Sequence, residues 1–123
     1  MEKSIAIIGA STNREKFGNK AVRAYLEKGW KVFPVNPKET EIEGISCYAS
    51  ISSISVRPER TSIYLPPKIT ISIIPELKKA GIKEVVLNPG AESEELITEL
   101  KKAGIRPLLF CSIRAIGVNP DDL

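Results

Sequence analysis

One kind of helix ending occurs three times along this chain, and it limits the folds that the chain can adopt. Glu27-Lys28-Gly29-Trp30, Lys78-Lys79-Ala80-Gly81-Ile82 and Lys101-Lys102-Ala103-Gly104-Ile105 each place lysine before a glycine and an apolar residue after it. Lysines complement the negative end of a helix dipole, glycine adopts the left-handed conformation of a C-cap, and the apolar residue packs against the last turn. We therefore expect three helices, one ending at each of these segments. A shared way of capping a helix, rather than an internal repeat, explains why Lys-Lys-Ala-Gly-Ile occurs twice.

Five short runs rich in β-branched and aliphatic residues alternate with these helices, at residues 3–9, 31–35, 61–65, 84–87 and 106–110. The nearly continuous apolar character of the first and fifth runs is typical of strands buried on both faces of a parallel sheet. Residues 39–59 are less regular and predict a short extra strand near 46–48 and a helical turn near 50–53. The pattern predicts an α/β, three-layer Rossmann-like fold. We expect a five-stranded, mainly parallel sheet in the order 3-2-1-4-5 with helices on both faces.

The size of the chain bounds its organisation. With 123 residues and 42% hydrophobic content, residues 1–123 are expected to form a single domain. No run approaches the ~20 apolar residues of a membrane span, and a strand-like run at residue 3 leaves no room for a signal peptide. We therefore expect a cytoplasmic protein with no membrane partner. The net charge of +3 suits a phosphorylated small molecule, whereas 6% aromatic residues and interspersed charges do not favour nucleic acid.

The absence of histidine excludes much of catalysis. A chain without histidine cannot build a Ser-His-Asp triad, a Cys-His pair or a phosphohistidine intermediate by itself. Cys47 and Cys111 stand far apart and belong to no metal-type cluster, so no metal site is expected.

The loop after the first strand is a candidate phosphate site. In an open sheet of this kind, ligands bind at the carboxyl ends of the strands. The small residues of Gly9-Ala10-Ser11-Thr12 would let backbone amides and two hydroxyls approach a diphosphate at the positive end of the first helix, with Arg14 and Lys16 adding charge. Only Gly9 and Gly18 are glycines here, so the loop is not Gly-x-Gly-x-x-Gly, and a plain strand-to-helix turn is the alternative.

The loop after the second strand bears on the choice of cofactor. Enzymes that use NAD place an acidic residue there for the ribose hydroxyls, whereas this chain has Val35-Asn36-Pro37-Lys38. Lys38 would attract a phosphorylated ribose, which favours coenzyme A or NADP over NAD. The alternative is a solvated lysine beside Glu39 and Glu41.

Three further segments reach the same edge. Leu65-Pro66-Pro67 makes a stiff apolar wall, and Gly90 of Asn88-Pro89-Gly90 permits close approach of a ligand to the backbone, although both are also ordinary turn sequences. Cys111 follows the fifth strand, where it would lie near a bound thiol and exchange with it, or remain a small buried residue.

Taken in chain order, these motifs resemble the stand-alone CoA-binding-domain proteins, which are similar to the CoA-binding Rossmann domain of the succinyl-CoA synthetase α subunit. The likeness spans nearly the whole chain, with departures at Arg60-Thr61 and at Ser112-Ile113-Arg114-Ala115. It implies that CoA is held by its 3'-phospho-ADP portion at the carboxyl edge of the sheet. The candidate contact residues are Gly9, Ala10, Ser11, Thr12, Arg14, Lys16, Val35, Asn36, Pro37, Lys38, Leu65, Pro66, Pro67, Asn88, Pro89 and Gly90.

The functional expectation is non-catalytic binding of CoA or a short acyl-CoA, as a carrier, sensor or regulatory module. The sequence does not identify a protein partner, and a homodimer is one alternative. An NADP-dependent oxidoreductase is the alternative, although its substrate region and proton donor would have to fit into loops without histidine. An adaptor that uses the sheet edge for protein contacts is a third hypothesis.

Overall fold

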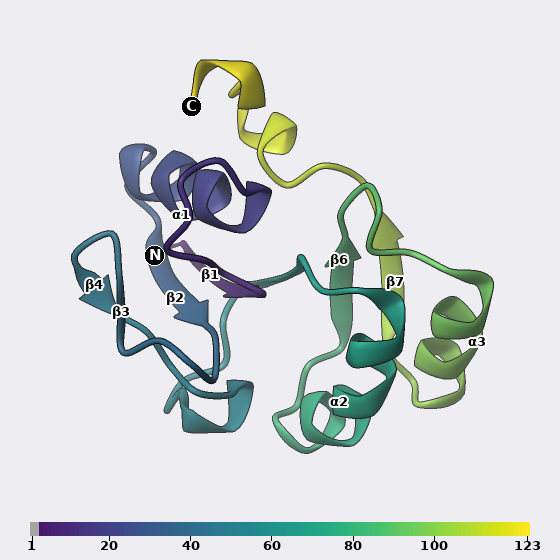
Figure 1. Ribbon diagram of the computed structural model, residues 1–123. Coiled ribbons are helices and arrows are strands. Elements are labelled where there is room, and N and C mark those ends of the chain that lie inside the picture. Colours follow the sequence, from purple (N-terminus) through teal and green to yellow (C-terminus); the bar gives the residue numbers. More distant parts are fainter. Residues whose placement is uncertain (1–2) are drawn as a thin grey trace.

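A computed structural model describes residues 3–123, so the first two residues of the expected domain lie outside the described part (Figure 1). Five strands form one parallel sheet, namely β1 (Ser4–Ile8), β2 (Lys31–Val35), β5 (Arg60–Ile63), β6 (Glu84–Leu87) and β7 (Arg106–Leu109). The helices between them are α1 (Phe17–Glu27), α2 (Pro67–Lys79) and α3 (Glu94–Lys102). Within residues 3–123 no helix combines the length and the hydrophobicity needed to cross a membrane. The α/β class and the five parallel strands are confirmed.

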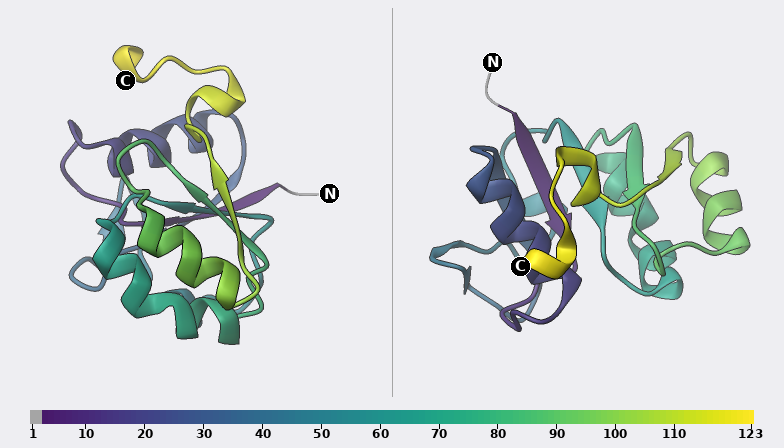
Figure 2. Two further views of the ribbon diagram at one scale, coloured as in Figure 1. Left: turned by 90° about the vertical axis from the view of Figure 1, so that its right-hand side faces the viewer. Right: turned by 90° about the horizontal axis from the view of Figure 1, so that it is seen from above.

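The sheet lies between two helical layers, as predicted. Figure 2 shows α1 and the C-terminal segment on one side of the sheet and α2 and α3 on the other. On the α1 side, Ile5 and Ile7 pack with Tyr25, and all three are fully buried. On the opposite side, Ala6 and Ile8 belong to one cluster with Leu77 of α2 and Leu100 of α3. The alternating side chains of β1 thus serve two cores, and the expectation that this strand is buried on both faces is confirmed.

The predicted order of the strands is wrong. The order is β2-β1-β5-β6-β7, which for the five predicted strands is 2-1-3-4-5 rather than 3-2-1-4-5. Ile8 pairs with Val35 on one side and with Ile63 of the third predicted strand on the other. Within residues 3–123, the position beyond β2 holds a single bridge, between Val35 and Tyr48, because the chain after β2 turns away into a hairpin of β3 (Glu41–Ile42) and β4 (Ile45–Ser46).

The last strand also differs from its prediction. Residues 106–110 were expected to be buried on both faces, but β7 is an edge strand and Leu109 is 59% exposed. Continuous apolar character alone does not distinguish a central strand from an edge strand.

The helix ends match their prediction. Gly29, Gly81 and Gly104 have φ values of 82°, 80° and 78°. The amide after each glycine bonds back into the helix, as Ile82 N does to the carbonyl oxygen of Leu77 at 3.1 Å. In the less regular segment, β4 and the Tyr48 bridge account for the extra strand, and Ile51–Ser53 forms the helical turn.

Candidate functional site

A cavity of about 780 Å³ opens at the carboxyl ends of β1, β5 and β6, between the starts of α1 and α2. This is the edge at which a sheet of this topology binds ligands. The cavity brings together most of the sequence-predicted residues, from four separate loops. Those that line it are Gly9, Ala10, Ser11, Lys16, Asn36, Leu65, Pro66, Pro67, Asn88, Pro89 and Gly90.

Five predicted residues are not among those that line this cavity. Thr12, Arg14, Pro37 and Lys38 are exposed, and Arg14 Nε lies 3.6 Å from a carboxylate oxygen of Glu43. Val35 is buried in the core on the α2 side, so its side chain faces the protein interior.

Gly9 and Gly18 allow close backbone packing next to the cavity. A Cβ atom on Gly9 would come within 2.7 Å of the carbonyl oxygen of Tyr64, and one on Gly18 would meet the carbonyl oxygen of Gly9. Gly9 also has a φ of 96°, which favours glycine. These two glycines therefore let β1, β5 and α1 approach one another, although the residues between them exceed the length of the dinucleotide fingerprint.

Some backbone amides of the first loop donate hydrogen bonds within the protein, and others do not. Gly9 N and Ala10 N both donate to the carbonyl oxygen of Val35, at 3.1 and 3.3 Å, so neither is free for a phosphate. Within residues 3–123, the amides of Ser11 and Thr12 donate no hydrogen bond. Amide donation to a ligand therefore falls to residues 11–12 and to the first turn of α1 rather than to Gly9 and Ala10.

The start of α1 is suited to an anion. Its N-cap, Lys16, makes no side-chain capping bond, and its first turn contains no acidic residue. By contrast, the start of α3 is capped by Ser93 Oγ, which accepts from Leu96 N at 3.1 Å, and its first turn carries Glu94 and Glu95. The first amides of an uncapped helix lack acceptors, and an anion there is favoured by the helix dipole.

Two buried or half-buried asparagines hold the loops of the site in place. Asn36 Nδ2 donates to the carbonyl oxygen of Ala10 at 2.9 Å and its Oδ1 accepts from Lys38 N at 2.8 Å, which joins the first two loops. Asn88 is only 2% exposed. Its Nδ2 donates to Ser62 Oγ and to the carbonyl oxygen of Ile63, and its Oδ1 accepts from Ser112 N at 2.8 Å. The Asn88 side chain is thus committed to structure.

Five cavity residues were not proposed as ligand contacts from the sequence, namely Glu15, Phe17, Gly18, Tyr64 and Ala91. Phe17 is 54% exposed despite its apolar ring. It is the first residue of α1 and lines the cavity. Tyr64 lines the cavity and packs against the α1-side cluster, and within the described residues its buried hydroxyl has no hydrogen-bond partner. Burial raises the pKa of Tyr64 far above its ordinary value, so this phenol stays neutral. Its position near the end of the predicted strand 61–65 is the sequence signal that marks Tyr64.

Neither cysteine is among the residues that line the cavity. Cys111 packs in the α1-side cluster together with Tyr64, half-buried, at the carboxyl end of β7. The thiol of Cys47 donates to the carbonyl oxygen of Asn36 at 3.7 Å, and burial raises its pKa. Exchange between Cys111 and a bound thiol stays a prediction.

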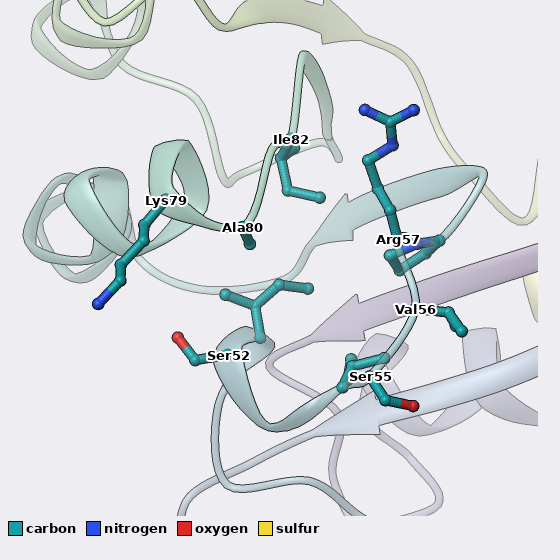
Figure 3. A pocket seen from close by; sticks show the side chains of 10 residues that line it. Ser52, Ser55, Val56, Arg57, Lys79, Ala80 and Ile82 are labelled. Carbon is teal, nitrogen blue, oxygen red and sulfur yellow. The ribbon is translucent and has the colours of Figure 1, made fainter.

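A second cavity, of about 400 Å³, lies at the opposite edge of the sheet, beside the end of α2 (Figure 3). Arg57 and Lys79 line it together with apolar Ile54 and Ile82, and Arg57 Nη1 donates to the carbonyl oxygen of Gly81 at 3.3 Å. None of the sequence-predicted residues line it.

The chain is similar to ADP-forming acetate-CoA ligases. It is 34% identical over 92 residues to the ADP-forming acetate-CoA ligase of Methanocaldococcus jannaschii, an alignment that covers 75% of this chain and 13% of the ligase. It is also 34% identical over 86 residues to the ADP-forming acetate-CoA ligase II subunit alpha of Pyrococcus furiosus, covering 69% of this chain and 19% of the subunit. The chain therefore spans less than a fifth of these relatives.

Solved structures give both a small and a large neighbour. A conserved hypothetical protein from Pyrococcus furiosus superimposes with a TM-score of 0.82 and 36% identity, over 94% of this chain and 99% of that one. A dinucleotide-forming acetyl-coenzyme A synthetase from Ca. Korarchaeum cryptofilum, in complex with phosphate and ADP, superimposes with a TM-score of 0.74 and 31% identity, over 86% of this chain and 25% of the synthetase. The family model described as CoA binding domain matches residues 3–116. The chain belongs to this family of CoA binding domains.

Proposed function

We propose that this protein binds coenzyme A, or a short acyl-CoA, through the 3'-phospho-ADP portion of the ligand and without catalysing a reaction on it. The observation that carries the proposal is the cavity at the carboxyl edge of the sheet, in which the uncapped start of α1 lies beside a glycine-supported loop. The family match speaks for CoA and gives no support to NADP.

In this proposal the diphosphate occupies the first loop and the start of α1. The amides of Ser11 and Thr12 and the ammonium of Lys16 supply donors and charge there. Lys38, exposed in the loop after β2, attracts the phosphate on the ribose. The pantetheine arm follows the apolar wall of Leu65, Pro66 and Pro67.

The cavity supports binding rather than catalysis. Of the residues that line it, only Glu15, Lys16 and Tyr64 have titratable side chains. The pKa of Tyr64 is raised by burial, so its phenol is a poor general acid or base near neutral pH. We infer a carrier, sensor or regulatory role for a single domain, while in the ligase relatives the matching region is a small part of a longer protein.

The proposal is tested by native mass spectrometry of the purified protein, followed by thermal-shift measurements with added CoA. We expect a bound CoA mass or a CoA-dependent rise in melting temperature. A protein that carries no ligand and whose melting temperature does not change at millimolar CoA would contradict the proposal.

A further inference from the structure

The β3–β4 hairpin has an unfavourable residue in its turn. Glu43 and Gly44 form the two-residue connection, and both have positive φ, 51° and 79°. Such turns strongly prefer asparagine, aspartate or glycine at the first position, because a longer side chain is strained in the left-handed region. Glu43 is the one non-glycine residue with positive φ in the described part of the chain. A strained residue of this kind persists when its side chain makes contacts that the fold uses.

The contacts of Glu43 lead to the first loop of the proposed CoA site. Its Oε2 atom accepts from Asn19 Nδ2 at 3.0 Å, and the same Nδ2 donates to the carbonyl oxygen of Ser11 at 2.8 Å. Asn19 lies in α1 and is fully buried, so neither of its amide hydrogens can turn to solvent. Arg23 Nε donates to Asn19 Oδ1 at 2.7 Å, which fixes the orientation of the amide.

A second connection joins Glu43 to the same loop further along. Arg14 Nε lies 3.6 Å from Glu43 Oε2, and Arg23 Nη2 donates to the carbonyl oxygen of Arg14 at 2.7 Å. The loop is thus held at Ser11 through Asn19 and at Arg14 through its backbone and its side chain. Removing the carboxylate would leave an Asn19 hydrogen buried without an acceptor. The amide would then shift, which weakens its hydrogen bond to the carbonyl oxygen of Ser11.

We propose that Glu43 is a positioning residue for the anion site: through Asn19 it holds Ser11 and the loop after β1 in the conformation that accepts phosphate groups. The inference rests on the proposed function, since Ser11 lines the cavity assigned to CoA. It assigns the β3–β4 hairpin a role in ligand affinity although the hairpin does not line that cavity.

The test compares CoA affinity by calorimetry for Glu43→Asn, Glu43→Gly and Glu43→Gln. Asparagine and glycine suit the turn, so the hairpin is retained or stabilised, but neither side chain can replace the carboxylate at Asn19. Glutamine keeps an acceptor of the same length. We expect CoA to bind about tenfold more weakly to the first two variants, and within about twofold of the wild type to Glu43→Gln. Glu41→Ala, an exposed change in the same hairpin, should bind as the wild type does.

The outcomes separate this inference from the function on which it rests. Wild-type protein that fails to bind CoA contradicts the proposed function. Wild-type binding together with unchanged affinity in Glu43→Asn and Glu43→Gly overturns the role of Glu43 alone. An equal loss in Glu43→Gln also overturns it, because the acceptor at Asn19 would then not matter.

Discussion

Gly18 in α1 packs so tightly on Gly9 at the end of β1 that a Cβ atom on Gly18 would collide with the Gly9 carbonyl oxygen. In the dinucleotide fingerprint, glycines at short spacing provide the tight turn and the helix–strand approach. Here the same two functions fall to residues separated by a longer loop, and that loop borders the cavity. The contact explains how a sequence without Gly-x-Gly-x-x-Gly brings a helix start to the sheet edge.

Gly18→Ala should therefore damage both stability and binding. The new methyl group must push α1 away from β1, which we expect to cost about 1–3 kcal/mol in the free energy of unfolding and to weaken CoA binding. Urea denaturation and calorimetry measure the two effects. Gly104→Ala is the matched control, because a Cβ there meets no atom within 4 Å and the cap lies far from the cavity. It should cost about 1 kcal/mol for its positive φ and leave binding unchanged. Unchanged stability and binding in Gly18→Ala would contradict this account of the packing.

Lys38→Ala should weaken CoA while sparing dephospho-CoA. If Lys38 contacts the ribose phosphate, loss of this charge-assisted bond costs about 1–3 kcal/mol for CoA alone. Calorimetric titration with both ligands measures the difference. Lys83→Ala removes a lysine that is also exposed but lies at the opposite edge, and it should change neither affinity. Equal losses for the two ligands in Lys38→Ala would place the ribose phosphate elsewhere.

The sequence predicts those features of the fold that depend on local chemistry. The caps at Gly29, Gly81 and Gly104 were predictable because lysine, glycine and an apolar residue act within one turn. The strand order was not, because the position of β5 beside β1 depends on where the chain goes after the hairpin, which no local pattern encodes. At the site, the loops were predictable from strand ends. The use of the Gly9 and Ala10 amides by Val35 was not, because that contact joins two loops.

Asn88→Ala should destabilise the protein strongly. It leaves the buried Ser112 amide and the Ile63 carbonyl without the partners that Asn88 provides, which we expect to cost about 2–4 kcal/mol. Denaturant unfolding monitored by the fluorescence of Trp30 measures the loss. Asn119→Ala is the comparison, because its side chain accepts from the exposed Asp121 amide in the last turn, and it should cost about 1 kcal/mol or less. Equal losses in the two variants would contradict the role given to Asn88.

Stability should fall at alkaline pH because of two buried phenols. Burial raises the pKa of Tyr64. Burial also raises the pKa of Tyr25, although the positive charge of Arg60 partly offsets this effect. A raised folded-state pKa means that the unfolded state ionises first. The stability contribution is therefore complete below about pH 9 and is lost as the pH rises above about 10. Unfolding free energies measured from pH 8 to pH 11 should show this decline.

Tyr64→Phe separates the contribution of one of these phenols. It removes a buried hydroxyl that has no partner in the described part of the chain, so at pH 8 it should be neutral or stabilising by up to about 1 kcal/mol. Its alkaline decline should be shallower than that of the wild type. A marked loss of stability at pH 8, or an unchanged alkaline decline, would contradict the assignment.

The central claim, CoA binding at the carboxyl edge of the sheet, is tested most directly by one calorimetric titration series with CoA, dephospho-CoA, NADPH and NADH. We predict saturable binding of CoA, weaker binding of dephospho-CoA and no saturable binding of NADH or NADPH. No saturable heat with CoA at millimolar concentration, or binding of NADPH in preference to CoA, would contradict it.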